Sequence, residues 1–446
     1  MASFISNFQP GDTARETTGL SNKILIKSVV IGALVLIMLI PSNLVQHLIT
    51  ERQDRQQQVV EEVSSKWAKP QTLSAPYLSI PYYLNGNPAQ KKQLVLLADE
   101  LKVKGEITEE DRKRSIFKVM LYRTSLVFSG SFRYPQNIDS STLILKDARL
   151  CFGLSDFRGI EDKLEIKLGN TVYSLTNGLP NTIIDSTGLS CPVSITGTEL
   201  ANSIGFNTAI NLRGSASLHF LPVASFSNYE IKSSWPNPSF DGNTLPLQRH
   251  ISGQGFLANW KFNAANLPFS NIVTSSFANH SDIVFGVTLI QPVGQYVKSM
   301  RSAKYAILII GLTFALFFTF ELLQKRPVHP VQYALIGIAL VIFYTLLVSI
   351  SEMMLFEYAY LIAAAATTVL ISLYAKTHFK TTRSAVIVCF LLIGLYSIIY
   401  ILISLEDTAL LTGSIALFIA VAVIMYVTRK INWYNAPERV LTDFQP

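Results

Sequence analysis

Six long apolar runs constrain the fold of this chain more than any other feature of its sequence. Each run has about the 20 residues that an α-helix needs to cross the hydrocarbon core of a bilayer. We place the expected transmembrane helices at residues 24–49, 304–323, 332–351, 356–375, 385–404 and 409–428. The chain is 49% hydrophobic and only 15% charged, which is too apolar for a soluble protein of this size. The sequence therefore predicts a multi-pass membrane protein.

The first apolar run has the basic start and apolar middle of a signal peptide. No small-x-small cleavage site follows it, so we interpret it as an uncleaved anchor in which Pro41 can introduce a kink. Residues 50–69 then contain many good helix formers and no helix breaker before the stretch KPQ. Val59, Val63 and Trp67 recur every four residues on one face. We expect this segment to form an amphipathic helical stalk.

The charges in the short connectors predict how the chain is oriented, because basic connectors face the cytoplasm. Lysine and arginine occur in the connectors QKRPVHP, KTHFKTTR and RKINWY, whereas SEMMLFE and LEDTA carry only acidic charges. Both ends of the chain, residues 1–23 and 429–446, are therefore expected in the cytoplasm. Residues from about 50 to 303 are expected on the outer side, which is the periplasm if the membrane is a bacterial inner membrane. Trp433 and Tyr434 are expected to anchor the chain at the interface.

Between the first two apolar runs, the pattern of side chains changes to a period of two. Apolar and polar residues alternate in LKVKGEI, KLEIKL and INLRGSASLHF, and again from Phe256 and from Ile283. This alternation is typical of antiparallel strands with one solvated face. We predict a large, mainly antiparallel β domain over residues 70–303, inserted between helices one and two. The sequence leaves open whether it is one domain or two small lobes.

The chain has three cysteines, two of which lie in the predicted β domain. These are Cys151 and Cys191, while Cys389 lies in an apolar run. Two cysteines in an exported domain can form a disulfide in an oxidising compartment if their geometry allows it. The sequence does not decide between a disulfide and two free thiols.

The stretch SSWPNPSFDGNTLP packs three prolines and two large aromatic residues into residues 233–246. The alternation of the preceding strand, NYEIKSSW, predicts that Trp235 points into the core. Pro236 and Pro238 are expected to end that strand, since proline cannot donate to a ladder of hydrogen bonds. Phe240 is then expected to fold back as a plug. The alternative interpretation is a rigid edge that recognises a peptide or a lipid.

Catalytic and cofactor-binding motifs are not found in the sequence. The six histidines are scattered singly, and there is no HExxH motif, G-x-S-x-G elbow, P-loop or G-x-G-x-x-G after a strand. We therefore predict no enzymatic activity, no metal and no cofactor. The net charge of +7 is not accompanied by a basic stripe or by zinc-finger spacing, so no nucleic-acid partner is predicted.

Three polar residues near the ends of the apolar runs are candidates for a site at the membrane interface: Glu321, His329 and Glu352. In the structural interpretation, their side chains reach water or headgroups, and His329 caps the helix that begins at Pro330. In the alternative, they line a polar path in a transporter or channel formed by helices two to six. A membrane-embedded enzyme would instead need polar side chains that converge at one depth.

The chain resembles the CreD family of inner membrane proteins, which are also described as cell-envelope-integrity proteins. The similarity keeps its order along nearly the whole chain and includes LIPSNLVQHLITERQDRQ, AKPQTLSAPYLSIPY, SSWPNPSFDGNTLP and RHISGQGFLANW. The resemblance implies a role in envelope integrity and stress response, with colicin tolerance in some bacteria, and it implies no enzymatic activity, cofactor or ligand. The family signature, of unknown role, matches Trp235, Pro236, Pro238, Ser239 and Phe240.

We therefore expect a non-enzymatic, multi-pass protein of the bacterial inner membrane. Its exported β domain is expected to bind a periplasmic or outer-envelope protein or a lipid, and its helices are expected to contact the bilayer. Its oligomeric state does not follow from the sequence.

Overall fold

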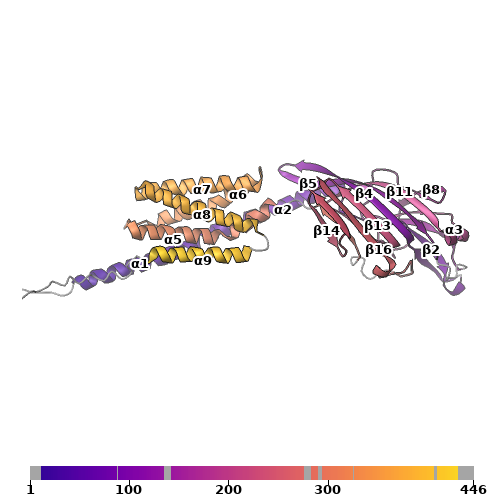
Figure 1. The fold of residues 1–446 in the computed structure, drawn as a ribbon, viewed down its shortest axis with the longest axis horizontal. Helices are drawn as coiled ribbons and strands as arrows, with labels where there is room; N and C mark the ends of the chain where they lie inside the picture. Colours follow the sequence, from indigo (N-terminus) through magenta and orange to yellow (C-terminus); the bar gives the residue numbers. More distant parts are fainter. Residues whose placement is uncertain are drawn as a thin grey trace, which may run out of the picture. The chain divides into compact units, whose positions relative to one another are not determined.

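The computed structural model describes residues 12–87, 89–134, 142–275, 283–289, 294–324, 326–405 and 409–429. The chain divides into a helical unit of residues 1–55 and 293–446 and a β unit of residues 56–292 (Figure 1). Six residues that we used to predict the orientation and the interfacial anchor lie outside the described residues. They are Lys325, Glu406, Asp407, Lys430, Trp433 and Tyr434.

The helical unit is a bundle of long apolar helices. Its elements are α1 (Asp12–Ile37), the first part of α2 (Leu39–Trp67), α4 (Gln295–Lys304), α5 (Ala306–Gln324), α6 (Pro330–Ser351), α7 (Phe356–Phe379), α8 (Thr382–Ser404) and α9 (Ala409–Thr428). From α5 to α9, each helix packs against the next one in the chain. Among the described residues, five helices are long and apolar enough to cross a membrane: Leu25–Trp67, α5, α6, α7 and α8. The 20-residue helix α9 coincides with the sixth expected span.

Large apolar side chains cover the outside of this bundle. Examples are Leu361 and Phe390, which are 66% and 70% exposed. Exposed apolar surface on this scale is stable only in contact with lipid. The exposed side chains and the apolar composition of the helices therefore both indicate a bundle in a membrane.

The first membrane helix is interrupted at Met38, between α1 and α2. The interruption lies one turn before Pro41, whose nitrogen has no hydrogen to donate to the carbonyl of Ile37. Helix α2 then continues to Trp67, so the segment predicted as a stalk is helical. Val59 and Trp67 are buried.

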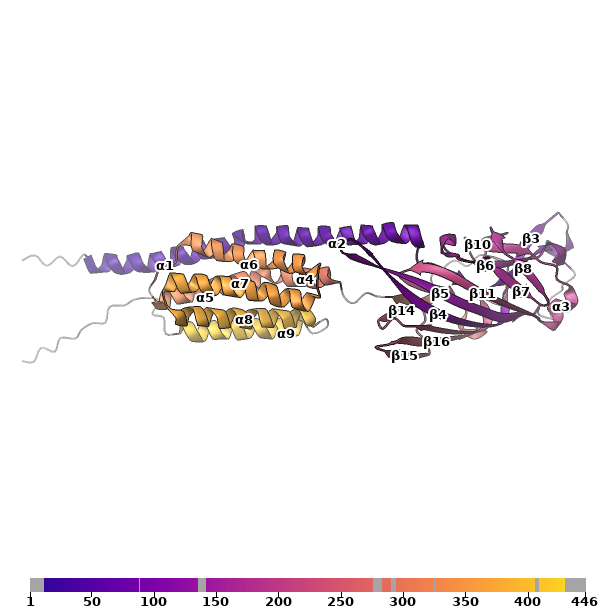
Figure 2. The ribbon, with the colours of Figure 1, turned by 90° about the horizontal axis from the view of Figure 1, so that it is seen from above.

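The described residues of the β unit form three sheets (Figures 1 and 2). The eight-stranded sheet has the order β15 (Gln248–Ser252), β16 (Gly255–Asn263), β13 (Ala224–Ser233), β4 (Ala98–Arg114), β5 (Phe117–Phe132), β11 (Ile204–Ser215), β7 (Glu165–Leu168) and β8 (Thr171–Ser174). The six-stranded sheet has the order β17 (Ile272–Val273), β3 (Lys91–Leu96), β2 (Tyr77–Tyr83), β6 (Arg149–Gly153), β10 (Gly188–Pro192) and β9 (Thr176–Asn177). The four-stranded sheet has the order β1 (Gln71–Ser74), β12 (Ser217–Leu221), β18 (Phe285–Leu289) and β14 (Pro238–Gly242).

One continuous hydrophobic core joins the three sheets, so the β unit is a single domain rather than two lobes. Phe285 is fully buried near its centre. Its ring centroid lies 4.8 Å from that of Tyr229, 5.3 Å from that of Trp260 and 4.8 Å from that of Phe262. Most strand pairings are antiparallel, as predicted, but β1 pairs with β12 and β4 pairs with β13 in parallel.

Two segments differ from the strand pattern that the sequence predicts. INLRGSASLHF forms two strands in different sheets, because the chain turns at Ala216, where φ is +60°. Residues 295–304, predicted within the β domain, form helix α4. This helix is amphipathic: Tyr296 and Ser299 are buried, while Lys304 on its other side is exposed.

The two cysteines of the β unit are free. They lie in the adjacent strands β6 and β10, where Cys151 is opposite Ser190 and Cys191 is opposite Leu150. Successive residues of a strand point to opposite faces, so this offset of one residue directs the two thiols away from each other. Burial raises the pKa of Cys191 to about 11 and raises that of Cys151 well above its usual value, which keeps both thiols protonated at neutral pH.

Candidate functional site

A buried ion pair lies inside the helical unit at the end of α5. Only 7% of the surface of Glu321 is exposed. Lys27 of α1 donates to its Oε1, and the hydroxyl of Tyr333 in α6 donates to its Oε2 over 3.0 Å. The cation neutralises the carboxylate, and both carboxylate oxygens have donors, which is the arrangement that permits a charge in an apolar bundle. The structural interpretation of the sequence expected this side chain to reach water or headgroups. In the structure it points into the bundle instead.

Further hydrogen bonds connect the helices at the same end of the bundle. Gln332 of α6 lies 3.2 Å from Nδ1 of His378 in α7. Gln324 of α5 donates to the hydroxyl of Ser384 in α8 over 2.6 Å. Together with Glu321, these contacts cross-link helices α1, α5, α6, α7 and α8.

A second polar cluster surrounds Glu352 at the C-terminal end of α6. The hydroxyl of Tyr296 in α4 donates to Oε1 of Glu352 over 2.9 Å, and Nε of Arg52 lies 3.8 Å from the same oxygen. Nearby, Lys298 of α4 donates to Oε1 of Glu357 over 2.8 Å. The charged side chains of this cluster are partly exposed, so each ion pair contributes at most about 1 kcal/mol to stability. The cluster ties α4 to the ends of α6 and α7.

His329 caps helix α6. Its Nδ1 accepts a hydrogen bond from the backbone N–H of Val331 over 3.3 Å, and the side chain of Gln332 accepts one from the N–H of His329 over 2.9 Å. Glu321 also lies near the start of α6, whereas Glu352 follows its last turn. The 22 residues of α6 span about 33 Å, so the structure does not bring the three predicted candidates into one site.

The signature stretch carries the chain from one sheet of the β unit to another. Strand β13 ends at Ser233, two residues before the predicted end, and Trp235 lies in the connection, where its Nε1 donates to the carbonyl of Asn237 over 3.0 Å. Trp235 is half-buried against the core, with Pro236 beside it. Pro238 opens β14, an edge strand, where a missing N–H is tolerated.

Phe240 and its neighbours attach β14 to the rest of the domain. The ring of Phe240 makes edge-to-face contacts with Phe256 at 5.5 Å and with Trp260 at 5.7 Å. Ser239 is the cross-strand partner of Thr288 in β18. The residues of the signature therefore make the packing contacts that hold this strand.

Hydrogen bonds between polar side chains cross the outer face of the four-stranded sheet. His219 and Asp241 both lie opposite Gly286, one on each side of β18. Because Gly286 has no side chain, the imidazole Nε2 reaches Oδ1 of Asp241 at 2.9 Å. Thr288 donates to the other carboxylate oxygen over 2.6 Å. These bonds link β12 to β14, and so they add to the attachment of the signature strand.

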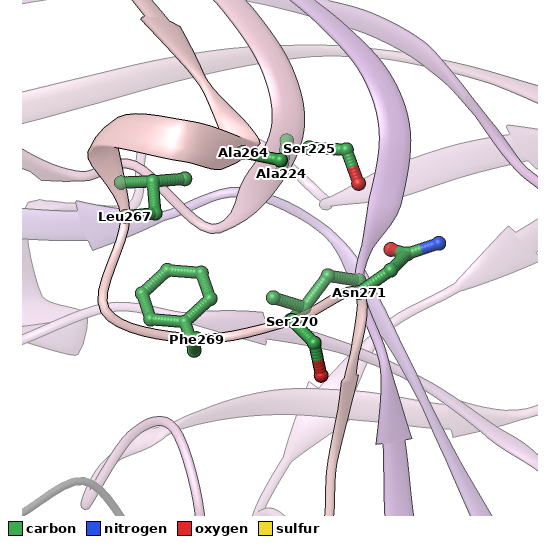
Figure 3. Close-up of a pocket in the computed structure, with 8 residues that line it drawn as sticks. Ala224, Ser225, Ala264, Leu267, Phe269, Ser270 and Asn271 are labelled. Carbon is green, nitrogen blue, oxygen red and sulfur yellow. The ribbon is translucent and has the colours of Figure 1, made fainter.

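A small cavity lies in the β unit, beside the turn that follows β16 (Figure 3). Its volume is about 10 Å³, which is the space of one water molecule. Its walls include Leu267, Phe269 and Asn271. A space of this size cannot hold an organic ligand.

Sequence reasoning missed the partners of the predicted acidic residues. Lys27 belongs to the basic start of the first apolar run, and no pattern in the sequence singles out Tyr333. The sequence held only an indirect signal: a lysine and a glutamate within apolar helices each need a partner in the membrane, but their positions do not say that they pair with each other.

The apolar helices and the β unit inserted between them define a multi-pass membrane protein with a large domain outside the bilayer. The family model described as "Inner membrane protein CreD" matches residues 23–434. The protein named Inner membrane protein CreD from Escherichia coli (strain K12) is 30% identical over 434 residues, covering 92% of this chain and 95% of the relative. The chain belongs to the CreD family of inner membrane proteins.

Proposed function

We propose that this protein is a non-enzymatic component of the bacterial inner membrane that supports the integrity of the cell envelope and the response to envelope stress. The observation that carries the proposal is a β unit with one continuous core, placed between membrane helices in a chain of the CreD family. In this proposal six helices span the membrane, both termini are cytoplasmic, and residues from about 50 to 303 face the periplasm.

The edge of the eight-stranded sheet supports a binding role for the β unit. All five residues of the edge strand β15 are exposed, including Ile251, and the preceding Leu247 is 66% exposed. An edge strand presents unpaired N–H and C=O groups that can pair with an added strand. We therefore propose that an envelope protein, or a lipid, contacts the β unit here.

Site-specific photo-crosslinking in cells tests this role. A photoreactive phenylalanine analogue at position 247 or 251 is expected to form an adduct with an envelope protein or a lipid. The same analogue at Val172, exposed on the opposite edge strand β8, is the matched control and is expected to yield less of that adduct. If no surface position of the β unit yields such an adduct, the binding role is refuted.

A transporter or channel formed by α5 to α9 is the second candidate function. The buried pair of Lys27 and Glu321 supports it, because ionisable groups within membrane helices often mark a transport path. The separation of Glu321 from Glu352 along α6 argues against one continuous site. A transporter that uses both carboxylates should lose complementation when both are changed to glutamine, so full rescue by that double variant would exclude this candidate.

A further inference from the structure

Two connections between the membrane helices lie side by side at one end of the helical unit. One joins α5 to α6, and the other joins α7 to α8. Nη1 of Arg326 in the first connection donates to the carbonyl oxygen of Phe379, the last residue of α7, over 3.0 Å. Val328 of the same connection is buried against the bundle. The first connection is therefore fixed beside the start of the second.

The connection between α7 and α8 is only two residues long, which keeps the cations around it close together. Lys380 ends α7 in a left-handed conformation, with φ of +54°. Lys376 lies in the last turn of α7, and Arg383 lies in the first turn of α8. Because Arg326 contacts the residue before Lys380, these four cations form one group, which we call the basic rim.

The positive charge of the basic rim is not neutralised by the described part of the chain. All four side chains are exposed, and none of them forms an ion pair with a carboxylate within the described residues. Among the side chains that the structure describes, Glu321 is the one carboxylate at this end of the bundle, and Lys27 already neutralises it. Like charges gathered in this way repel one another, and an external anion would relieve the repulsion.

Exposed apolar side chains place the basic rim at the surface of the bilayer. Three of its cations, those at positions 326, 376 and 383, each have such a side chain three residues away, toward the middle of the adjoining helix. These side chains are Leu323, Leu373 and Val386. Exposed leucine and valine on a membrane helix contact hydrocarbon. The cations therefore lie where hydrocarbon gives way to water, which is the level of the lipid phosphates.

We propose that the basic rim binds the phosphate of an anionic phospholipid in the leaflet at this end of the bundle. Lys380 and Arg383 contact the phosphate from the two sides of the short connection, and Lys376 and Arg326 add to the positive charge around it. The acyl chains lie along the exposed apolar side chains of α7 and α8. These side chains favour a lipid over a free phosphate ion, which would make no contact with them.

The inference rests on the helical unit alone. It requires neither the proposed function nor a particular orientation of the chain in the membrane, since both leaflets present phosphates at this level.

Native mass spectrometry of the purified full chain in detergent tests the proposal, because it counts the lipid molecules that are bound. Phosphatidylglycerol and phosphatidylcholine of equal chain length are titrated separately, and we expect the first phosphatidylglycerol to bind more tightly. Changing Lys380 and Arg383 to glutamine should weaken its binding about five-fold for each charge removed. The variant Lys376→Gln leaves the short connection unaltered and should by itself cause a loss of about five-fold. Far-UV circular dichroism checks that both variants are folded.

The matched control changes Lys102 and Lys261, two exposed lysines of the β unit, to glutamine. It alters the net charge by the same amount as the double variant of the rim and should leave the affinity for phosphatidylglycerol unchanged. Equal affinities of the unaltered chain for the two lipids, unchanged affinities in the rim variants, or an equal loss in the control would each overturn the proposal. Displacement of phosphatidylglycerol by glycerophosphoglycerol, which has the same headgroup but no acyl chains, would assign the rim to a soluble phosphate ligand instead.

Discussion

Replacing Glu321 with leucine is expected to lower the free energy of unfolding of the helical unit by about 3 kcal/mol. The substitution leaves the ammonium of Lys27 in the bundle without its carboxylate and the hydroxyl of Tyr333 without its acceptor. An unpaired charge in this environment costs more than the pair itself contributes. Far-UV circular dichroism of the full chain during titration with a denaturing detergent measures the loss.

The double variant Lys27→Met with Glu321→Leu is the matched control, since it removes both charges and keeps apolar volume. We expect it to recover most of the stability that the single variant loses. Equal stabilities of the single variant and the unaltered chain would show that the pair is solvated and would contradict its burial.

Replacing Phe285 with alanine is expected to destabilise the β unit by about 3–5 kcal/mol. Phe285 is fully buried where β18 packs against the eight-stranded sheet, and the loss of its ring leaves a cavity among Tyr229, Trp260 and Phe262. Denaturant unfolding followed by tryptophan fluorescence measures the change in the full chain. Trp260 is a direct reporter, because its ring lies 5.3 Å from that of Phe285.

Phe226→Ala provides the comparison, because it removes the same side chain from a strand of the same unit where it is 57% exposed. Its effect should stay within about 0.5 kcal/mol. Similar losses in the two variants would mean that Phe285 is not a centre of the core.

The periodicity of the sequence predicted the helices and strands of this protein better than it predicted which of them contact each other. Runs of about 20 apolar residues correctly indicated α5, α6, α7 and α8, since the thickness of a bilayer sets their length. Period-two alternation indicated β4 and β16 for an equally local reason. The CreD family, which the order of similar stretches suggested, is confirmed by the family match over residues 23–434.

Features that depend on distant residues were out of reach. Lys27 and Glu321 are 294 positions apart, and no local pattern states that α1 and α5 meet. The parallel pairing of β4 with β13 also depends on how the sheets assemble, which alternation cannot reveal. The signature stretch shows the same limit. The alternation of apolar and polar residues placed Trp235 on a strand, but the chain leaves β13 at Ser233 to join another sheet.

Labelling of engineered cysteines tests most directly whether the β unit is exported. Gln248 of β15 and Arg383 of α8 are both exposed, and each is changed to cysteine in a chain that also carries Cys389→Ser. The buried, protonated thiols of Cys151 and Cys191 keep the background low. In intact spheroplasts, a membrane-impermeant maleimide should label position 248 at once and position 383 only after permeabilisation. Labelling of position 383 but not position 248 in intact spheroplasts would contradict an exported β unit.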